Sequence, residues 1–293
     1  MQSETGLQLL ARLGSRPSIS DVVSPIFKDG LNPKDVVELC GLEGTGKSEI
    51  LLNIVASVIL PKTWKSIPLN GKDASVIFID NDYKFSILRL VALMENRISV
   101  NLKTVDQQDL ELTNDIEVLI KKCLSKLSLI RCASSSEFLV TLYSLEQTLL
   151  SNPNISVVMI DSISAFYWID KCSNGESVAA QEKNMKLATE VLSKFVNNFS
   201  LIVIATKCDF YKKRTRDEDF ISEASSVSHF ENFKSDHQDY MCKAWGQFVT
   251  KKFLLEKQIF TNSFRCYGTE NRMSKTDRSA ITFKITENGV QSM

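Results

Sequence analysis

Continuous apolar runs alternate along this chain with longer stretches in which apolar residues recur every three or four positions. Short continuous runs are typical of strands buried on both faces, whereas a period near 3.6 is typical of helices that bury one face. The runs predict strands over residues 36–40, 74–80, 127–131, 155–161 and 201–206. The periodic stretches predict helices over residues 49–60, 84–98, 109–126, 136–151 and 176–199. This alternation predicts an α/β fold with a mostly parallel sheet and helices on both faces.

The pattern changes past residue 209. Residues 210–240 are charged, rich in serine and without periodicity, which predicts a mobile loop. Beyond them, residues 245–255 and 280–285 read as strands joined by polar turns. We expect these strands to form an antiparallel C-terminal extension of the same sheet, so that residues 36–293 make one core.

Residues 1–35 precede the first predicted strand. Leu7, Leu10 and Leu13 lie near helical spacing and are followed by a connection that contains proline and serine. This stretch is too short for an independent fold. We therefore expect an N-terminal extension without a domain of its own.

The loop between the first strand and the first helix carries the strongest signal for chemistry. It fits G-x-x-x-x-G-K-[ST], in which backbone N–H groups wrap nucleotide phosphates and the helix N-terminus faces them. Lys47 brings a charge to the β- and γ-phosphates, and the Ser48 hydroxyl can hold Mg²⁺. The alternative is a plain glycine-rich turn, but the strand before and the helix after favour a site for ATP and Mg²⁺. The loop residues are Gly41, Leu42, Glu43, Gly44, Thr45, Gly46, Lys47 and Ser48.

Acidic residues end two of the other predicted strands. A P-loop nucleotide site needs a second acid at a strand end to hold Mg²⁺, and Asp161 is placed for this role. The alternative is that Asp161 caps the following turn. Asp80 and Asp82 lie two residues apart, so in an extended segment they share a face. Either one could orient an attacking water, or be solvated instead.

Two further segments contain residue types that can contact nucleic acid. The basic run at residues 211–216 is followed at once by three acidic residues, so a solvated loop is favoured over a phosphate contact or an import signal. The aromatic residues 166–168 directly follow the Asp161 strand. Packing or a protein interface is favoured there over base stacking, because Lys171 is the one cation nearby in the sequence.

The composition describes an ordinary soluble protein. Of 293 residues, 43% are hydrophobic, and 35 basic side chains balance 35 acidic ones, so no overall charge draws the chain to nucleic acid or membrane. Seven scattered cysteines without a C-x-x-C pair suit a reducing compartment. His229 and His237 lack the spacing of a zinc site. The longest apolar run is too short for a bilayer and no secretory signal is present, so we expect an intracellular protein with no membrane partner.

Taken together, these residues resemble the RecA-type recombinases, specifically the eukaryotic recombinase paralogues, over nearly the whole chain. The phosphate loop resembles the family's first loop, and residues 79–85 with Arg89 resemble the segment of the catalytic glutamate and the adenine-side arginines. Residues 161–167 resemble the magnesium strand and first DNA loop, and residues 243–246 and 286–290 resemble the closing strands. The resemblance implies a RecA-like P-loop ATPase core, Arg89 beside adenine, and a role in homologous-recombination repair of DNA double-strand breaks.

Several positions depart from that family's pattern. The catalytic glutamate corresponds to Asp82, whose carboxylate is retracted by about 1.5 Å. Because a misplacement of about 1 Å can cost about 10²-fold in rate, ATP binding is expected to survive while turnover is slow or absent. Other family positions are replaced too. Ser86 stands at the position of an adenine-side arginine, and Lys207 and Cys208 stand at the positions of the pair that couples the γ-phosphate to the second DNA loop. The positions of the arginines of the first DNA loop are occupied by Trp168, Asn174 and Ala180.

The resemblance also implies a nuclear location and particular partners. These are other eukaryotic recombinase paralogues in a hetero-oligomer, most directly the D-type paralogue, with single-stranded or branched DNA reached through the complex. Family members usually carry a small helical domain and a linker that pairs with the neighbouring core. Residues 1–35 cannot hold both, so we expect this subunit to receive a neighbour's linker and to offer none onward.

Two functional hypotheses follow. In the first, the chain is a non-catalytic or weakly ATP-binding subunit of a recombinase-paralogue complex. In the second, it is an active DNA-stimulated ATPase with its own strand-exchange activity. Asp82, Lys207 and Cys208 favour the first hypothesis, whereas the phosphate loop is compatible with both. A small-molecule kinase is disfavoured, because no lid or acceptor site is visible.

Overall fold

The fold is described from a computed structural model. It describes residues 16–20, 22, 26–27, 30–103, 112–173, 177–209, 240–258, 260–270 and 280–293, with a few isolated positions before residue 16. The predicted mobile loop at 210–240 lies outside the described residues except for Tyr240, and so do Leu7, Leu10 and Leu13. Within the described part, no helix combines the length and the apolar character needed to cross a membrane.

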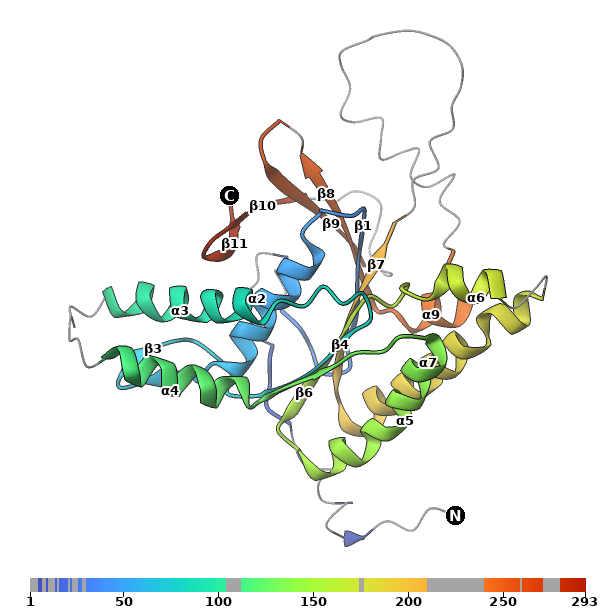
Figure 1. Ribbon diagram of the computed structural model, residues 1–293, viewed down its shortest axis with the longest axis horizontal. Coiled ribbons are helices and arrows are strands. Elements are labelled where there is room, and N and C mark those ends of the chain that lie inside the picture. The colour runs from blue at the N-terminus through green and yellow to red at the C-terminus, as the bar shows by residue number, and fades with distance from the viewer. Residues whose placement is uncertain are drawn as a thin grey trace, which may run out of the picture.

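A nine-stranded sheet forms the centre of the molecule, in the order β11-β10-β9-β8-β1-β7-β6-β4-β5 (Figure 1). The strands are β1 (Val36–Gly41), β4 (Ser75–Asp80), β5 (Leu127–Ile130), β6 (Ile155–Asp161), β7 (Ile202–Cys208), β8 (Lys251–Gln258), β9 (Ser263–Glu270), β10 (Ile281–Thr286) and β11 (Gly289–Ser292). The helices are α2 (Lys47–Ile59), α3 (Ile87–Lys103), α4 (Leu112–Leu124), α5 (Ser135–Ser151), α6 (Tyr167–Ser173), α7 (Val178–Phe199) and α9 (Lys243–Phe248).

Two hydrophobic cores lie on opposite faces of the sheet. On β4, the side chains of Val76 and Phe78 join the core under α2, α3 and α4, whereas those of Ile77 and Ile79 join the core under α5, α7 and α9. Both sets are buried because a parallel strand is covered on each face. Figure 1 shows these two groups of helices on either side of the sheet. The prediction of a mostly parallel sheet with helices on both faces is confirmed.

The parallel part of the sheet brings four chain segments to one edge. β5, β4, β6, β7, β1 and β8 are mutually parallel, so their carboxyl ends lie on the same side. Gly41, Asp80, Asp161 and Cys208 end four of these strands. In open parallel sheets, ligands bind in the crevice beyond the carboxyl ends of the strands.

The described residues before β1 pack onto this core. The Arg16 guanidinium donates to the carbonyl oxygens of Leu149 and Ile155, at 2.7 and 2.6 Å, and lies 5.1 Å from the ring centre of Phe199. It therefore satisfies a carbonyl at the end of α5, where helices leave such groups unpaired. Further along, apolar side chains enter the core under α2: Ile19, Val22, Ile26, Phe27 and Leu31.

The structure differs from the sequence prediction in the C-terminal part and after α2. The predicted strand over 245–255 is wrong at its start, because Lys243–Phe248 forms α9 and β8 begins only at Lys251. β8 also pairs parallel to β1, so the antiparallel extension begins at β9 and continues through β10 and β11. Finally, the polar stretch after α2 contains a small hairpin of β2 (Thr63–Trp64) and β3 (Ile67–Pro68).

Candidate nucleotide site

The predicted phosphate loop connects β1 directly to α2. Gly44 and Gly46 have φ values of 75° and 86°, in the left-handed region that favours glycine. A Cβ atom on Gly46 would also lie 2.4 Å from Cδ1 of Ile285, a residue of β10. The loop therefore needs glycine at residue 46 for its backbone conformation, and the C-terminal hairpin β10–β11 packs closely against it.

The ammonium of Lys47 lies inside this loop. Its Nζ atom donates to the carbonyl oxygens of Gly41 and Leu42, each at 2.7 Å. Burial lowers the pKa of Lys47 below its usual value. A partly desolvated cation at the N-terminal end of α2 suits the recognition of an anion such as a phosphate.

Ser48 and Asp161, the two residues expected to hold Mg²⁺, lie next to each other. The Ser48 hydroxyl donates to Oδ2 of Asp161 at 2.6 Å, although the two residues are 113 positions apart in the chain. Asp161 is buried at the end of β6, and the Thr206 hydroxyl of β7 donates to its other carboxylate oxygen. The Asp161–Ser162 peptide bond is cis.

The donor set at Ser48 and Asp161 fits Mg²⁺. A hydroxyl oxygen and a carboxylate oxygen are hard ligands, and Mg²⁺ is commonly held by one or two carboxylates together with substrate phosphates and waters. When bound, the ion would neutralise phosphate charge. Among the described residues, no group of three or more His, Cys, Asp and Glu side chains is arranged around a metal position. The chain's own ligands for Mg²⁺ would thus be Ser48 and Asp161.

Asp80 and Asp82 do not share a face, because the extended segment stops at Asp80. Asp80 is fully buried and accepts hydrogen bonds from the backbone N–H groups of Lys84 and Phe85, at 2.9 and 3.2 Å. Its Oδ2 atom also pairs with Nε of Arg131 at 3.3 Å. Asp80 is therefore neither solvated nor placed to orient a water, and its visible role is to hold the turn after β4.

Asp82 lies on the other side of this turn, close to the magnesium candidates. Its backbone N–H donates to the Asp161 carbonyl oxygen at 3.1 Å. Partial burial raises the pKa of Asp82, and the nearby Asp161 carboxylate adds to this effect. The structure thus brings Asp82 to the same edge as Asp161, while its part in catalysis stays a prediction.

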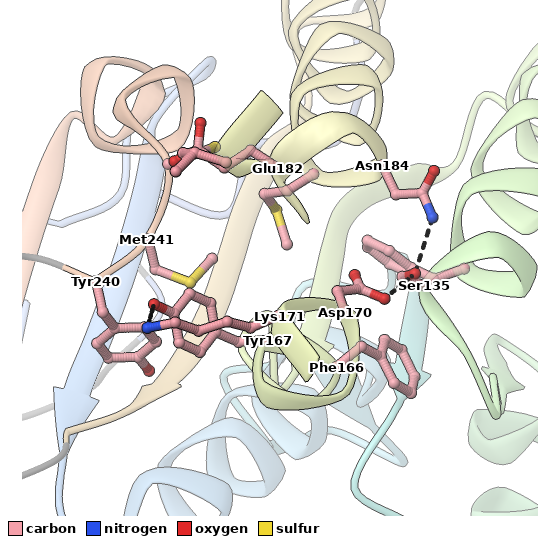
Figure 2. A pocket seen from close by; sticks show the side chains of 13 residues that line it. Ser135, Phe166, Tyr167, Asp170, Lys171, Glu182, Asn184, Tyr240 and Met241 are labelled. Atoms are coloured by element: carbon pink, nitrogen blue, oxygen red, sulfur yellow. Dashed lines mark hydrogen bonds between the residues drawn. The ribbon is translucent and has the colours of Figure 1, made fainter. Parts of the chain in front are cut away.

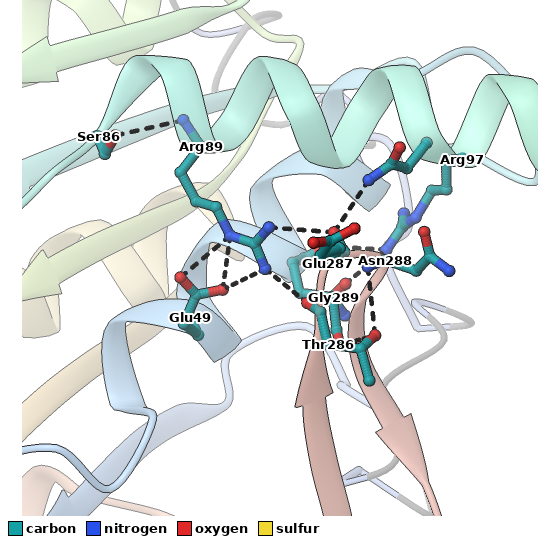
Figure 3. Close-up of polar contacts among 10 residues, drawn as sticks. Glu49, Ser86, Arg89, Arg97, Thr286, Glu287, Asn288 and Gly289 are labelled. Atoms are coloured by element: carbon teal, nitrogen blue, oxygen red, sulfur yellow. Dashed lines mark hydrogen bonds and ion pairs between the residues drawn. The ribbon is translucent and has the colours of Figure 1, made fainter.

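Arg89 lies on α3 with its guanidinium in a network of protein groups. Nε donates to both carboxylate oxygens of Glu49, at 3.2 and 3.1 Å, and Nη2 donates to Oε2 of Glu49 at 3.0 Å. The same guanidinium donates to the carbonyl oxygens of Thr286 and Glu287, at 2.7 and 3.0 Å (Figure 3). Contact of Arg89 with adenine remains a prediction. Its visible partners are α2 and the turn between β10 and β11.

Lys207 ends up in a buried cluster that the sequence did not indicate. Its Nζ atom lies 3.4 Å from Oε1 of Glu38, on the neighbouring strand β1. Glu38 is 1% exposed and also receives the indole N–H of Trp245 at 2.6 Å and the ammonium of Lys252 at 3.1 Å. Lys207 also lies 5.2 Å from the ring centre of Tyr240. A buried acid within an apolar strand is the only sequence signal for this cluster.

The aromatic cluster after β6 lines a cavity of about 200 Å³ beside α6. The ring centre of Tyr167 lies 4.6 Å from that of Tyr240, while Trp168 is 47% exposed. Lys171 sits 5.5 Å from the ring centre of Tyr167. Figure 2 shows Tyr167 and Tyr240 together at one end of this cavity. Tyr167 is engaged in packing, in line with the interpretation favoured from the sequence.

The other end of the cavity is polar. Ser135 donates to Oδ1 of Asp170 at 2.8 Å, and Asn184 donates to the Ser135 hydroxyl at 2.9 Å (Figure 2). These bonds join α6 to the starts of α5 and α7. Since Asp170 brings a carboxylate into the lining, the cavity offers little attraction for a nucleic-acid phosphate.

This chain is similar to known DNA repair proteins. A family model described as an AAA domain matches residues 13–208. The mouse (Mus musculus) "DNA repair protein XRCC2" is 34% identical over 292 residues, which cover 99% of this chain and 97% of the mouse protein. The Arabidopsis thaliana "DNA repair protein XRCC2 homolog" is 29% identical, covering 92% and 81%. The Cricetulus griseus "DNA repair protein RAD51 homolog 3" is 24% identical over 62% of this chain and 48% of its own length.

Proposed function

Since this chain belongs to the XRCC2 family of RecA-type DNA repair proteins, we propose that its phosphate loop binds ATP with Mg²⁺ and hydrolyses it slowly or not at all. The chain is a recombinase-paralogue subunit in DNA repair, related to the RAD51 proteins. We place its work in the homologous-recombination repair of double-strand breaks, in the nucleus. The observation that carries the nucleotide proposal is the 2.6 Å hydrogen bond from Ser48 to Asp161, which joins the loop to the acid at the end of β6.

The residues of the loop have separate tasks in this proposal. Backbone N–H groups at the start of α2 bind the phosphates. Lys47 gives up its hydrogen bonds to the carbonyl oxygens of Gly41 and Leu42 and contacts the phosphates instead. Ser48 and Asp161 face Mg²⁺, with Thr206 holding the Asp161 carboxylate in place. These residues bind and orient the nucleotide, and none of them moves a proton.

The catalytic alternative, an active strand-exchange ATPase, is not favoured. Its water-orienting group would be Asp82, which carries a shorter side chain than the glutamate of active family members. Its γ-phosphate coupling position is Lys207, whose ammonium is committed to Glu38 inside the sheet. Because that ion pair is buried, freeing Lys207 would leave a charge uncompensated at a high cost.

ATP turnover tests this proposal directly. Turnover is measured with and without single-stranded DNA for the wild-type chain and for Lys47→Ala, together with binding of a fluorescent ATP analogue in Mg²⁺. We expect the wild-type chain to bind the ATP analogue and Lys47→Ala to abolish this binding. We expect ATP turnover to stay near background both with and without DNA. Brisk turnover that requires DNA and disappears in Lys47→Ala would establish the active ATPase instead. An absence of binding in the wild-type chain would refute the nucleotide site.

We further propose that the D-type paralogue is the direct partner, and that DNA is reached through the resulting complex. A surface suited to a RecA-type partner is the edge strand β5, which has β4 as its one neighbour in the described sheet. An extended partner segment can add to such an edge by backbone hydrogen bonds. Leu129 on β5 is 39% exposed, and Val140 and Tyr143 on the following helix are 68% and 54% exposed.

Co-purification tests the partner and the surface separately. The wild-type chain should co-purify with the D-type paralogue, and Leu129→Lys should reduce the recovery. Val100→Lys, at another exposed apolar residue on α3, serves as the matched control. If Leu129→Lys pairs normally, docking at β5 is refuted while the partner stands. If the wild-type chain does not pair, the partner itself is refuted.

A further inference from the structure

A carboxylate occupies the first turn of the helix that would receive the phosphates. Glu49 directly follows Ser48 on α2, and its side chain is 30% exposed. The N-terminal end of a helix attracts one negative group through its free N–H groups and its dipole. A bound nucleotide would therefore place two anions, its phosphate and the Glu49 carboxylate, near the same helix end. Their repulsion would weaken phosphate binding unless a cation compensates it.

Arg89 supplies that cation. It makes three hydrogen bonds to Glu49, so that both carboxylate oxygens are occupied, and its side chain is 24% exposed. Planar guanidinium groups hold carboxylates in a fixed orientation through such multiple bonds. Water screens this pair only in part, because neither side chain is fully exposed.

The C-terminal hairpin fixes Arg89 in turn. The carbonyl oxygens of Thr286 and Glu287 accept from Nη2 and Nη1 of Arg89, and Asn96 of α3 also donates to Glu287, at 3.1 Å (Figure 3). These two carbonyls lie where β10 ends and the tight turn to β11 begins. The turn is held against α2 as well, since a Cβ atom on Gly289 would lie 2.5 Å from Oδ1 of Asn53.

We propose that Arg89 is a positioning residue for the phosphate loop: it compensates and immobilises Glu49, with the β10–β11 turn as its anchor. Arg89 then favours nucleotide binding without contacting the base. The proposal rests on the nucleotide site proposed above, and it replaces direct adenine recognition by Arg89. It makes a specific demand, namely that Arg89 matters only while Glu49 carries a charge.

A double-mutant cycle tests this demand. Binding of Mg²⁺–ATP and of inorganic tripolyphosphate is titrated for the wild-type chain, Arg89→Ala, Glu49→Gln and the double variant. We expect Arg89→Ala to lower the affinity for both ligands by roughly tenfold, because the uncompensated Glu49 carboxylate then repels the phosphates. Glu49→Gln removes the charge but keeps the size of the side chain. In that background, Arg89→Ala should therefore change the affinity by less than about twofold.

Asn96→Ala is the matched control for the hairpin. It removes a bond to the Glu287 carbonyl oxygen but leaves the Arg89–Glu49 pair, so it should lower the thermal midpoint without changing either affinity. Loss of ATP binding with tripolyphosphate binding retained in Arg89→Ala would assign Arg89 to the base and overturn the proposal. If Arg89→Ala lowers the affinity as much in the Glu49→Gln background as in the wild-type chain, the proposal is overturned too, while the nucleotide site stands. If the wild-type chain binds neither ligand, the site and the inference both fall.

Discussion

The Lys207 ammonium lies 3.4 Å from the Glu38 carboxylate in the middle of the sheet, and both side chains are at most 4% exposed. The two residues lie on the neighbouring strands β1 and β7. Trp245 and Lys252 bind the same carboxylate from α9 and β8. A single buried acid thus organises three elements beside the nucleotide loop, because a charge that far from water requires partners.

Replacing Glu38 should strongly destabilise the fold. Glu38→Ala leaves the buried Lys207 ammonium uncompensated, at a cost of about 3–5 kcal/mol in the free energy of unfolding. Urea denaturation followed by tryptophan fluorescence measures this loss. The double variant Glu38→Leu with Lys207→Met removes both charges and should recover much of it. Equal destabilisation of the single and double variants would mean that the ion pair does not govern stability at this position.

Lengthening the side chain at residue 82 should increase ATP turnover. Asp82→Glu moves the carboxylate outward by about 1.5 Å, toward the length found in active family members. We expect a rise of about tenfold or more over the wild-type rate in steady-state phosphate release. Asp82→Asn serves as the control and should stay at background. If Asp82→Glu is as slow as the wild-type chain, the shorter carboxylate is not what limits hydrolysis.

The stability of the fold should depend on pH through Asp82. Its pKa is raised in the folded state, so the folded chain holds a proton that the unfolded chain has lost as pH rises above about 4. Stability should therefore fall between the ordinary aspartate pKa and the raised one. Asp82→Asn removes this dependence and should raise the thermal midpoint near pH 7, with little change near pH 3. If the wild-type chain and Asp82→Asn have identical melting curves at pH 7 as well as at pH 3, the expected effect of Asp82 on stability is contradicted.

Arg16 should anchor the segment that precedes β1. Arg16→Met keeps much of the side-chain volume but removes the hydrogen bonds to the carbonyl oxygens of Leu149, Asn152 and Ile155. We expect a loss of about 2 kcal/mol in the free energy of unfolding, since these hydrogen bonds come from a charged donor. Hydrogen exchange should also quicken at residues 16–20. An unchanged midpoint in chemical denaturation would rule out this anchoring role.

Much of the fold was predictable because strands buried on both faces have continuous apolar sequences. All five strands predicted before residue 209 are present, with shifts of one or two residues at their ends. The prediction failed at Trp245, since a stretch that contains Trp245, Phe248 and Val249 suits a strand and a short buried helix equally well. What decides between them is the hydrogen bond of the Trp245 indole to Glu38, across 207 positions of the chain.

The site was predictable to a different degree at each residue. Ser48 and Asp161 lie together because the loop after β1 and the end of β6 reach the same side of a parallel sheet, which follows from the sequence pattern. The distinction between Asp80 and Asp82 does not follow from it, because it depends on the turn at residues 81–83, where Tyr83 has a φ of 57°. The pairing of Arg89 with Glu49 and Thr286 was also hidden, since it joins segments 40 and 197 positions apart.

The close approach of Ile285 to Gly46 has a consequence for biosynthesis. The loop at residues 41–48 leaves the ribosome well before the β10–β11 hairpin that packs against it. A nascent chain that already holds β1 and α2 therefore still lacks the side chain that packs against Gly46 in its phosphate loop. Nucleotide capture should begin only after β10 and β11 have been translated, and a premature stop codon before β10 should yield a polypeptide that cannot retain ATP.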